Sequence, residues 1–205
     1  VTIKAGEIGS YVDPENPHGA ASSGVVDAAG TVYLDAENIG IGNDTKEALR
    51  LADGSVVEID SPLNSVYMTS AGSVQVGTEG GTASELTVGK DAEKDGTGVF
   101  SLVAKNAELM SGIKAEEMLL VTATDGSVTS DGKLTSGGDI VMNATDTITL
   151  KDDVNADGDV NVKTGDLLFE PQAADSVKVS GNNVTIEQMA GTATPGKAHI
   201  SADNE

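Results

Sequence analysis

One recurring pattern constrains this chain more than any other feature: a glycine, one or two polar residues, and then apolar residues at alternate positions. It occurs as GTVYL at position 30, GSVVEI at 54, GSVQV at 72, GSVT at 126, GDIVM at 138, GDVNV at 158 and GNNVTI at 181. Four of the six spacings between neighbouring copies lie between 18 and 24 residues, one is longer and one is shorter. A repeat near this length with variable insertions is typical of a solenoid.

Pairs of apolar residues two positions apart fill the space between these glycines, as in Leu119 with Val121 and Val160 with Val162. This spacing places both members of a pair on one face of a strand. One coil of this kind buries about four to six side chains at roughly 2 kcal/mol each, against an ordering cost of roughly 1.5 kcal/mol for each of about 20 residues. A single coil is therefore unstable, and the coils must stack so that each pairs with the next.

The sequence thus predicts an all-β fold, a parallel β-helix (β-solenoid) of about 18–28 residues per coil with two to three short strands in each. We expect residues 1–205 to form a single β-solenoid segment, part of a longer chain or of a stacking fibre, because neither end resembles an amphipathic cap. The segment 10–24 (SYVDPENPHGAASSG) is predicted to be a surface loop.

The rival fold is an antiparallel sandwich, which also shows short alternating strands at regular spacing. Its hairpins favour Asn-Gly turns, and this dipeptide is absent. The glycines instead open strands at a repeated phase, which fits the corners of a parallel coil.

Two stretches have a helix-forming composition, TKEALRL (45–51) and KNAELMSGIKAEEMLL (105–120). Gly112 interrupts the second stretch, and the pairs after it restore a period of two. We therefore predict strands in both. Only five aromatic residues occur among the 205, and none is Trp, so the interior must consist mainly of aliphatic side chains.

The formal charge of −21 argues against binding to nucleic acid or to anionic membranes. Cysteine is absent, so disulfides are excluded. No stretch approaches 18 consecutive apolar residues, and we expect no membrane insertion.

Two segments resemble the repeat regions of bacterial exoproteins of the filamentous haemagglutinin type. They are GDIVMNATDTITLKDDVNADGDVNV (138–162) and the stretch 37–77, which runs from ENIGIG through a Tyr-containing strand to GSVQVG. The resemblance implies a right-handed parallel β-helix, export across the outer membrane, and a stalk or adhesive role outside the cell. A secretion-domain signature is not found, so this segment is expected to be shaft.

One segment matches the start of a calcium-binding loop. Asp153, Asn155, Asp157 and Gly158 follow the first six positions of an EF-hand, but Thr164 stands where the closing acid belongs and Asp166 comes two residues late. The alternative interpretation is a corner at 157–159 followed by a strand, which repeats the pattern at 139–142. We favour the corner and predict no metal site and no cofactor, leaving open a weak calcium ion on so acidic a rod.

Support for catalysis is weak. His18 and His199 are isolated, and Ser111 with Lys114 forms an S-x-x-K pair that lacks companion motifs. The expected function is therefore a non-enzymatic structural shaft or stalk, a rigid spacer in adhesion or cell-cell contact, located at a bacterial surface or outside the cell. Its expected partners are further coils, stacked end to end or continuing in the same chain, and a host or neighbouring cell. The alternatives are an adhesive module that recognises a glycan or a protein through a lateral loop (10–24 or 90–98), and a β-helical enzyme acting on polysaccharides.

Overall fold

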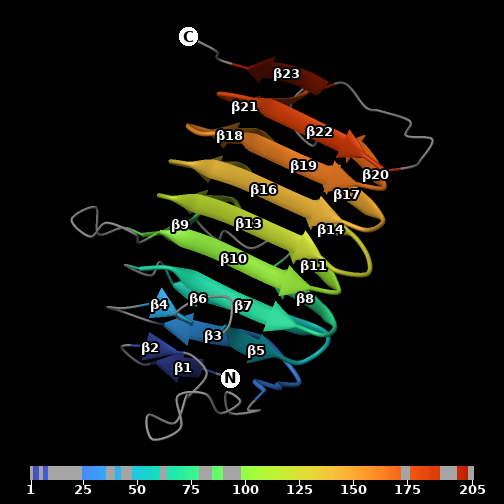
Figure 1. Cartoon of the computed structure of the whole chain (residues 1–205). Helices are drawn as coiled ribbons and strands as arrows, with labels where there is room; N and C mark the ends of the chain where they lie inside the picture. Colours follow the sequence, from blue (N-terminus) through green and yellow to red (C-terminus); the bar gives the residue numbers. More distant parts are fainter. Residues whose placement is uncertain are drawn as a thin grey trace, which may run out of the picture.

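The computed structural model describes residues 2–4, 7–8, 25–35, 40–42, 48–60, 64–78, 85–89, 98–171, 176–189 and 198–202. Within these ranges the chain is all-β and winds into a column of stacked coils, the predicted β-solenoid (Figure 1). Every strand pair in the described part of the chain is parallel, which excludes the antiparallel sandwich. The predicted loop at 10–24 lies outside the described residues, and so do residues 90–97 of the other candidate lateral loop, 90–98.

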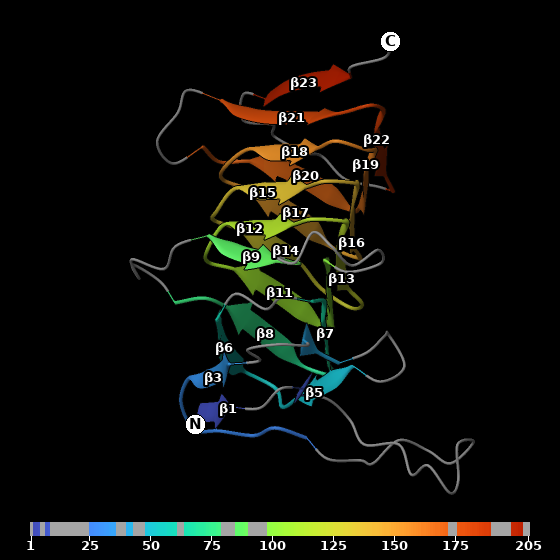
Figure 2. The same cartoon turned by 90° about the vertical axis from the view of Figure 1, so that its left-hand side faces the viewer.

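Three parallel sheets form the sides of the column (Figures 1 and 2). Sheet A contains, in spatial order, β1 (Thr2–Lys4), β3 (Val32–Asp35), β6 (Ser55–Asp60), β8 (Ser73–Val76), β11 (Asn106–Leu109), β14 (Val128–Ser130), β17 (Thr147–Leu150) and β20 (Asp166–Phe169). Sheet B contains β2 (Glu7–Ile8), β4 (Gly40–Ile41), β7 (Val66–Ser70), β10 (Val99–Ala104), β13 (Met118–Ala123), β16 (Asp139–Ala144), β19 (Val160–Thr164) and β22 (Val184–Gln188), with β5 (Leu49–Leu51) also paired to β7. Sheet C contains β9 (Leu86–Val88), β12 (Ile113–Ala115), β15 (Leu134–Ser136), β18 (Val154–Ala156), β21 (Val177–Gly181) and β23 (Ala198–Ala202).

The coils from β10 onward are the most regular part of the column. In sheet B, Val99 pairs with Met118, Met118 with Asp139, and Ile140 with Val160, which then pairs with Val184. Each of these coils is therefore about 20 residues long, within the range predicted for a solenoid of this kind. The coil that joins β7 to β10 is longer, because Val66 of β7 pairs with Phe100 of β10. Part of the chain between these two residues lies outside the described ranges.

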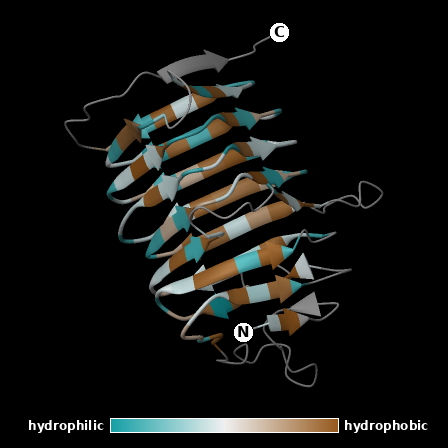
Figure 3. Cartoon of the chain, turned by 180° about the vertical axis from the view of Figure 1, so that it is seen from behind, coloured by the Kyte–Doolittle hydropathy of each residue, from teal (hydrophilic) through white to brown (hydrophobic). Residues whose placement is uncertain are grey.

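In the regular coils, alternate side chains of the strands point into the column and form one continuous apolar core, as in β13 and β16. Phe100, Leu119, Ile140 and Val160 stack on one another in sheet B, and all are fully buried. Figure 3 shows the resulting alternation of apolar and polar residues along the strands. The core is aliphatic apart from Phe100 and Phe169, as the composition predicted.

Both stretches of helix-forming composition contain strands, as predicted. β5 lies within 45–51, while β11, β12 and the start of β13 occupy 105–120. Period two prevails over helix propensity because burial of one strand face in a stacked coil outweighs the intrinsic preference of each residue.

The glycine-led segments occupy two different places in the coil, although their shared pattern suggested a single one. Those at 30, 54, 72 and 126 precede strands of sheet A, whereas those at 138, 158 and 181 precede strands of sheet B. Each sheet is entered through a corner, and similar corners demand the same residue type. The close approach of stacked coils explains the glycine at two of these positions, since a Cβ would collide with the carbonyl oxygen of Lys105 at Gly126 and with that of Glu117 at Gly138.

Candidate functional site

The segment that resembles a calcium loop is divided between two corners and a strand. Asn155 lies in the middle of β18, with Asp153 in the corner before it and Asp157 in the corner after it. Val160 and Val162 of β19 pair with Ile140 and Met142 of β16, so the predicted repeat of the 139–142 pattern is confirmed. The extended strand replaces the curled loop that an EF-hand requires.

Side-chain oxygens of this segment bind the next coil instead. Asp153 Oδ1 accepts a hydrogen bond from the backbone N–H of Lys178 at 2.7 Å, and Asn155 Oδ1 accepts one from the Ser180 hydroxyl at 2.6 Å. Among the described residues, no three His, Cys, Asp or Glu side chains lie close enough together to hold a metal ion.

Corner acids and amides play the same part elsewhere along the column. Asp53 Oδ1 accepts a hydrogen bond from Ser73 N, and Asp139 Oδ1 accepts one from Asp159 N, each reaching 20 residues along the chain to the next coil. Asp159 Oδ1 continues the series by accepting from both the backbone and the side-chain nitrogen of Asn183. We call these contacts the corner ladder. Each of these corner aspartates therefore helps to hold neighbouring coils together.

The structure describes three of the four other residues that the sequence singled out. Ser111 lies in the corner between β11 and β12, and Lys114 lies in β12, where its Nζ donates a hydrogen bond to Glu116 Oε1 at 2.6 Å. This hydrogen bond and the charge of Glu116 raise the pKa of Lys114 above its ordinary value. His199 belongs to β23, and His18 lies outside the described residues.

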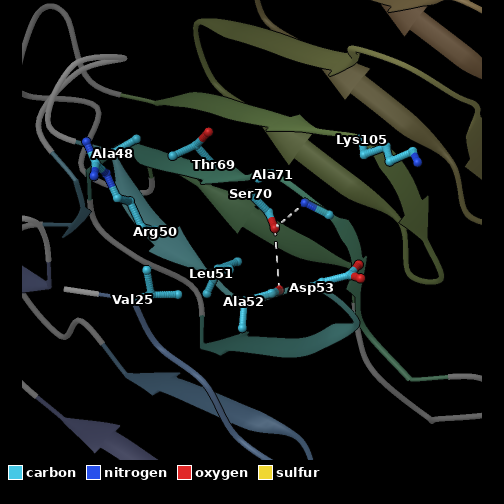
Figure 4. A pocket seen from close by; sticks show the side chains of 11 residues that line it. Val25, Ala48, Arg50, Leu51, Ala52, Asp53, Thr69, Ser70, Ala71 and Lys105 are labelled. Carbon is cyan, nitrogen blue, oxygen red and sulfur yellow. Dashed lines mark hydrogen bonds between the residues drawn. The ribbon is translucent and has the colours of Figure 1, made fainter. Parts of the chain in front are cut away.

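A lateral hollow of about 790 Å³ opens on the side of the column (Figure 4). It lies beside β5 and β7, and the corner residues at 52–53 and 71–72, together with Val25 and Lys105, complete its lining. Its volume falls in the range of small-molecule sites. We refer to it as the β5–β7 groove.

The groove owes its existence to an irregularity in sheet B. Both β4 and β5 pair with the single strand β7, at Val66 and at Met68–Ser70 respectively. On its other side β5 meets only an isolated bridge from Val26 to Leu51, where the regular coils have a full strand. Among the described residues, the wall of the column is therefore incomplete at this level.

Arg50 is the residue that gives the groove its chemistry, and it is the only arginine of the chain. Leu49 and Leu51 point into the core, so Arg50 between them points outward, beside Thr69 of β7. Sequence reasoning did not identify this site. The available signal was a single arginine on a predicted strand in a chain with 33 acidic residues.

Comparison of the chain with protein-family profiles, with curated protein sequences and with solved structures gives no match. The described residues include no helix long and apolar enough to cross a membrane. The class of the protein is thus defined by its fold alone, a parallel β-solenoid built from repeated coils.

Proposed function

We propose that this chain is a structural shaft, a rigid spacer that projects or connects other elements in adhesion or cell-cell contact. The observation that carries the proposal is the stacking of parallel strands along one axis. Strands of sheets A and B pair continuously from the first coils to the last, over one apolar core. With strands about 4.8 Å apart, such a column gains length by adding coils without changing its width.

Two kinds of contact favour stiffness. The backbone of each regular coil is hydrogen-bonded to the coils on both sides, for example through Ile113 N to Lys133 O and Leu134 N to Asp153 O. The corner ladder adds side-chain bonds in the same direction. A bending force must therefore break bonds on several sides of the column at once.

The location and the partners belong to the same proposal. The resemblance of 37–77 and 138–162 to exoproteins of the filamentous haemagglutinin type supports a place outside a bacterium or on its surface. The partners are further coils, in the same chain or stacked end to end, with a host or neighbouring cell as the surface contacted. The role is non-catalytic and uses no cofactor.

The direct test is to lengthen the shaft. Duplicating the segment 139–158 inserts one complete coil and preserves the register of Ile140 on Val160. We expect each inserted copy to fold, to add about 4.8 Å to the maximum dimension from small-angle X-ray scattering, and to keep a strand-rich circular dichroism spectrum. Duplicating only 139–148 inserts half a coil, which breaks the register; this matched control should unfold locally.

Loss of folded structure in the full-coil duplication would contradict the shaft. The same samples test the calcium question. We expect their spectra and melting temperatures to be the same in millimolar calcium and in chelator. A melting temperature that falls on chelation would instead assign Asp153–Asp157 to a metal site.

A further inference from the structure

The β5–β7 groove lies on the side of the column, so the stacking of coils does not fill it. Figure 4 shows Arg50 and Lys105 towards opposite ends of the groove, with Thr69 and Ser70 between them. The Ser70 hydroxyl is occupied, since it donates to Ala52 O and accepts from Gly72 N. Among the described residues of the lining, the side chains that can donate a hydrogen bond to a ligand are therefore those of Arg50, Lys105 and Thr69.

The Arg50 guanidinium makes no hydrogen bond or ion pair with any residue in the described part of the chain. Its backbone is held firmly all the same, because Arg50 O accepts from Val26 N at 2.9 Å and Arg50 pairs with Thr69. A guanidinium presents five N–H donors in a planar fork that matches a carboxylate. A half-buried, well-anchored arginine whose donors no described residue uses is suited to receive such a group.

The charge of the groove is opposite to that of the chain. Arg50 and Lys105 carry two positive charges against one negative charge on Asp53, whose Oδ1 already accepts from Ser73 N. Lys105 is bound only weakly within the described structure, through an exposed contact of 4.0 Å to Asp125. The described residues that line the groove thus carry a net positive charge, with Asp125 beside Lys105 but outside the lining, on a chain of net charge −21.

The rest of the lining selects the body of the ligand. Val25, Ala48, Leu51, Ala52 and Ala71 give it small aliphatic surfaces, and Val25 is 53% exposed. No aromatic residue is among the described residues that line the groove, so a sugar ring finds no stacking platform there. A short aliphatic group fits these surfaces better.

We propose that the β5–β7 groove binds a carboxylate on a short aliphatic body, with Arg50 holding the carboxylate and Lys105 adding to the attraction. This chemistry is found at the C-terminus of a peptide ending in Ala or Val and in a free branched-chain acid. The shaft then carries a lateral binding site as well as a structural role. The site does not depend on the shaft proposal, because it needs only the local pairing of β5 with β7.

The test is a titration of the ¹⁵N-labelled protein by NMR with three probes: N-acetyl-Ala-Val with a free C-terminus, the same dipeptide as its C-terminal amide, and isovalerate. The free dipeptide is expected to shift the amide signals of residues 50–53 and 69–72, with dissociation in the range of about 0.1–1 mM. The amide should bind at least about tenfold more weakly, since it loses the charge-assisted pair. Isovalerate binding as tightly as the dipeptide would support the proposal with a free acid as the ligand, and weaker binding would support it with a peptide terminus.

Variants locate the effect. R50Q should weaken binding of the free dipeptide about tenfold or more, and R50K by a smaller factor because lysine lacks the fork. K105A should weaken it about threefold at low salt and less at high salt. K133A removes an exposed lysine from the corner between β14 and β15 and is the matched control, with no expected change.

Chemical labelling gives an independent readout that does not need a stable variant. Because Arg50 is the only arginine, phenylglyoxal modifies arginine at one site, and mass spectrometry can follow it. The free dipeptide should slow this modification and the amide should not. Equal binding of acid and amide, or binding unchanged in R50Q, would overturn the proposal.

Discussion

Leu119 and Leu120 are adjacent, identical side chains on opposite faces of β13, and they offer the sharpest test of the fold. Leu119 is fully buried and stacks between Phe100 and Ile140, which are fully buried as well. Leu120 stacks between Ser101 and Val141 on the outer face and is only half-buried. Replacing each by Ala removes the same atoms from two different environments.

The expected cost differs because only one substitution leaves a cavity. In L119A the backbone hydrogen bonds keep the coils above and below at a fixed spacing, so the cavity cannot close. The free energy of unfolding is therefore expected to fall by about 3 kcal/mol. In L120A the outer face loses only part of its contact area, and the loss should be about 1 kcal/mol. With a urea dependence of about 2 kcal/mol per molar, the unfolding midpoint falls by roughly 1.5 M in the first variant and roughly 0.5 M in the second.

Urea unfolding followed by circular dichroism measures both midpoints. The slope of each transition must match that of the unsubstituted chain, because a lower slope would mean that coils unfold separately and that the midpoints are not comparable. Equal shifts for the two variants, or a larger shift for L120A, would refute the assignment of inner and outer faces. That result would also remove the basis for the stacked core.

Three further perturbations follow from the contacts. Ser65 is buried, and its hydroxyl accepts hydrogen bonds from Gly98 N and Val99 N at 3.2 and 3.1 Å. S65A should therefore lower the free energy of unfolding by about 2 kcal/mol. T129A, on the outer face of sheet A, should change it little. In the corner ladder, D159A should lower the free energy of unfolding in urea by about 1 kcal/mol. D159N keeps the acceptor oxygen and should retain most of the stability. Equal losses in the two variants would show that the bond to Asn183 contributes nothing. Because its pKa is raised, Lys114 stabilises the fold through Glu116 below the pKa of an unfolded lysine, and this contribution disappears as the pH rises through the folded pKa. An NMR titration of the Lys114 side chain should show its pKa falling towards the ordinary value in E116Q. An unchanged pKa would count against the pairing.

Much of the fold was predictable because a stacked coil repeats one simple demand. Each strand buries one face, so a period of two identifies it even where the composition favours a helix, as in 105–120. The match between 139–142 and 159–162 predicted a register that the structure confirms, with Ile140 on Val160. The register could be predicted because these two copies of the repeat are separated by one coil without an insertion.

Other features depend on contacts far apart in the sequence. The shared glycine pattern could not distinguish entry to sheet A from entry to sheet B, because glycine stands at both corners for different reasons. Gly138 lies against a carbonyl oxygen of the neighbouring coil, whereas Gly54 has open space around it and a positive φ of 74°. The local sequence of 153–158 is compatible with a curled loop and with a corner, and the bond from Lys178 N to Asp153, 25 residues away, belongs only to the second.

The β5–β7 groove was the hardest feature to predict. It requires β4 and β5 to share β7 as a partner, and no local pattern announces that two short strands will pair with one. The outward position of Arg50 followed from period two, but the hollow beside it did not.

The direction of the inter-coil hydrogen bonds has a mechanical consequence. In the regular coils these bonds run along the axis of the column, so a pull on the chain ends lifts a terminal coil directly off its neighbour. Its bonds then load one after another rather than together, and each released coil of about 20 residues yields roughly 70 Å of extended chain. A tether of this kind unfolds under tension in small, repeated steps. Each step dissipates mechanical energy and lowers the tension before the next coil is loaded.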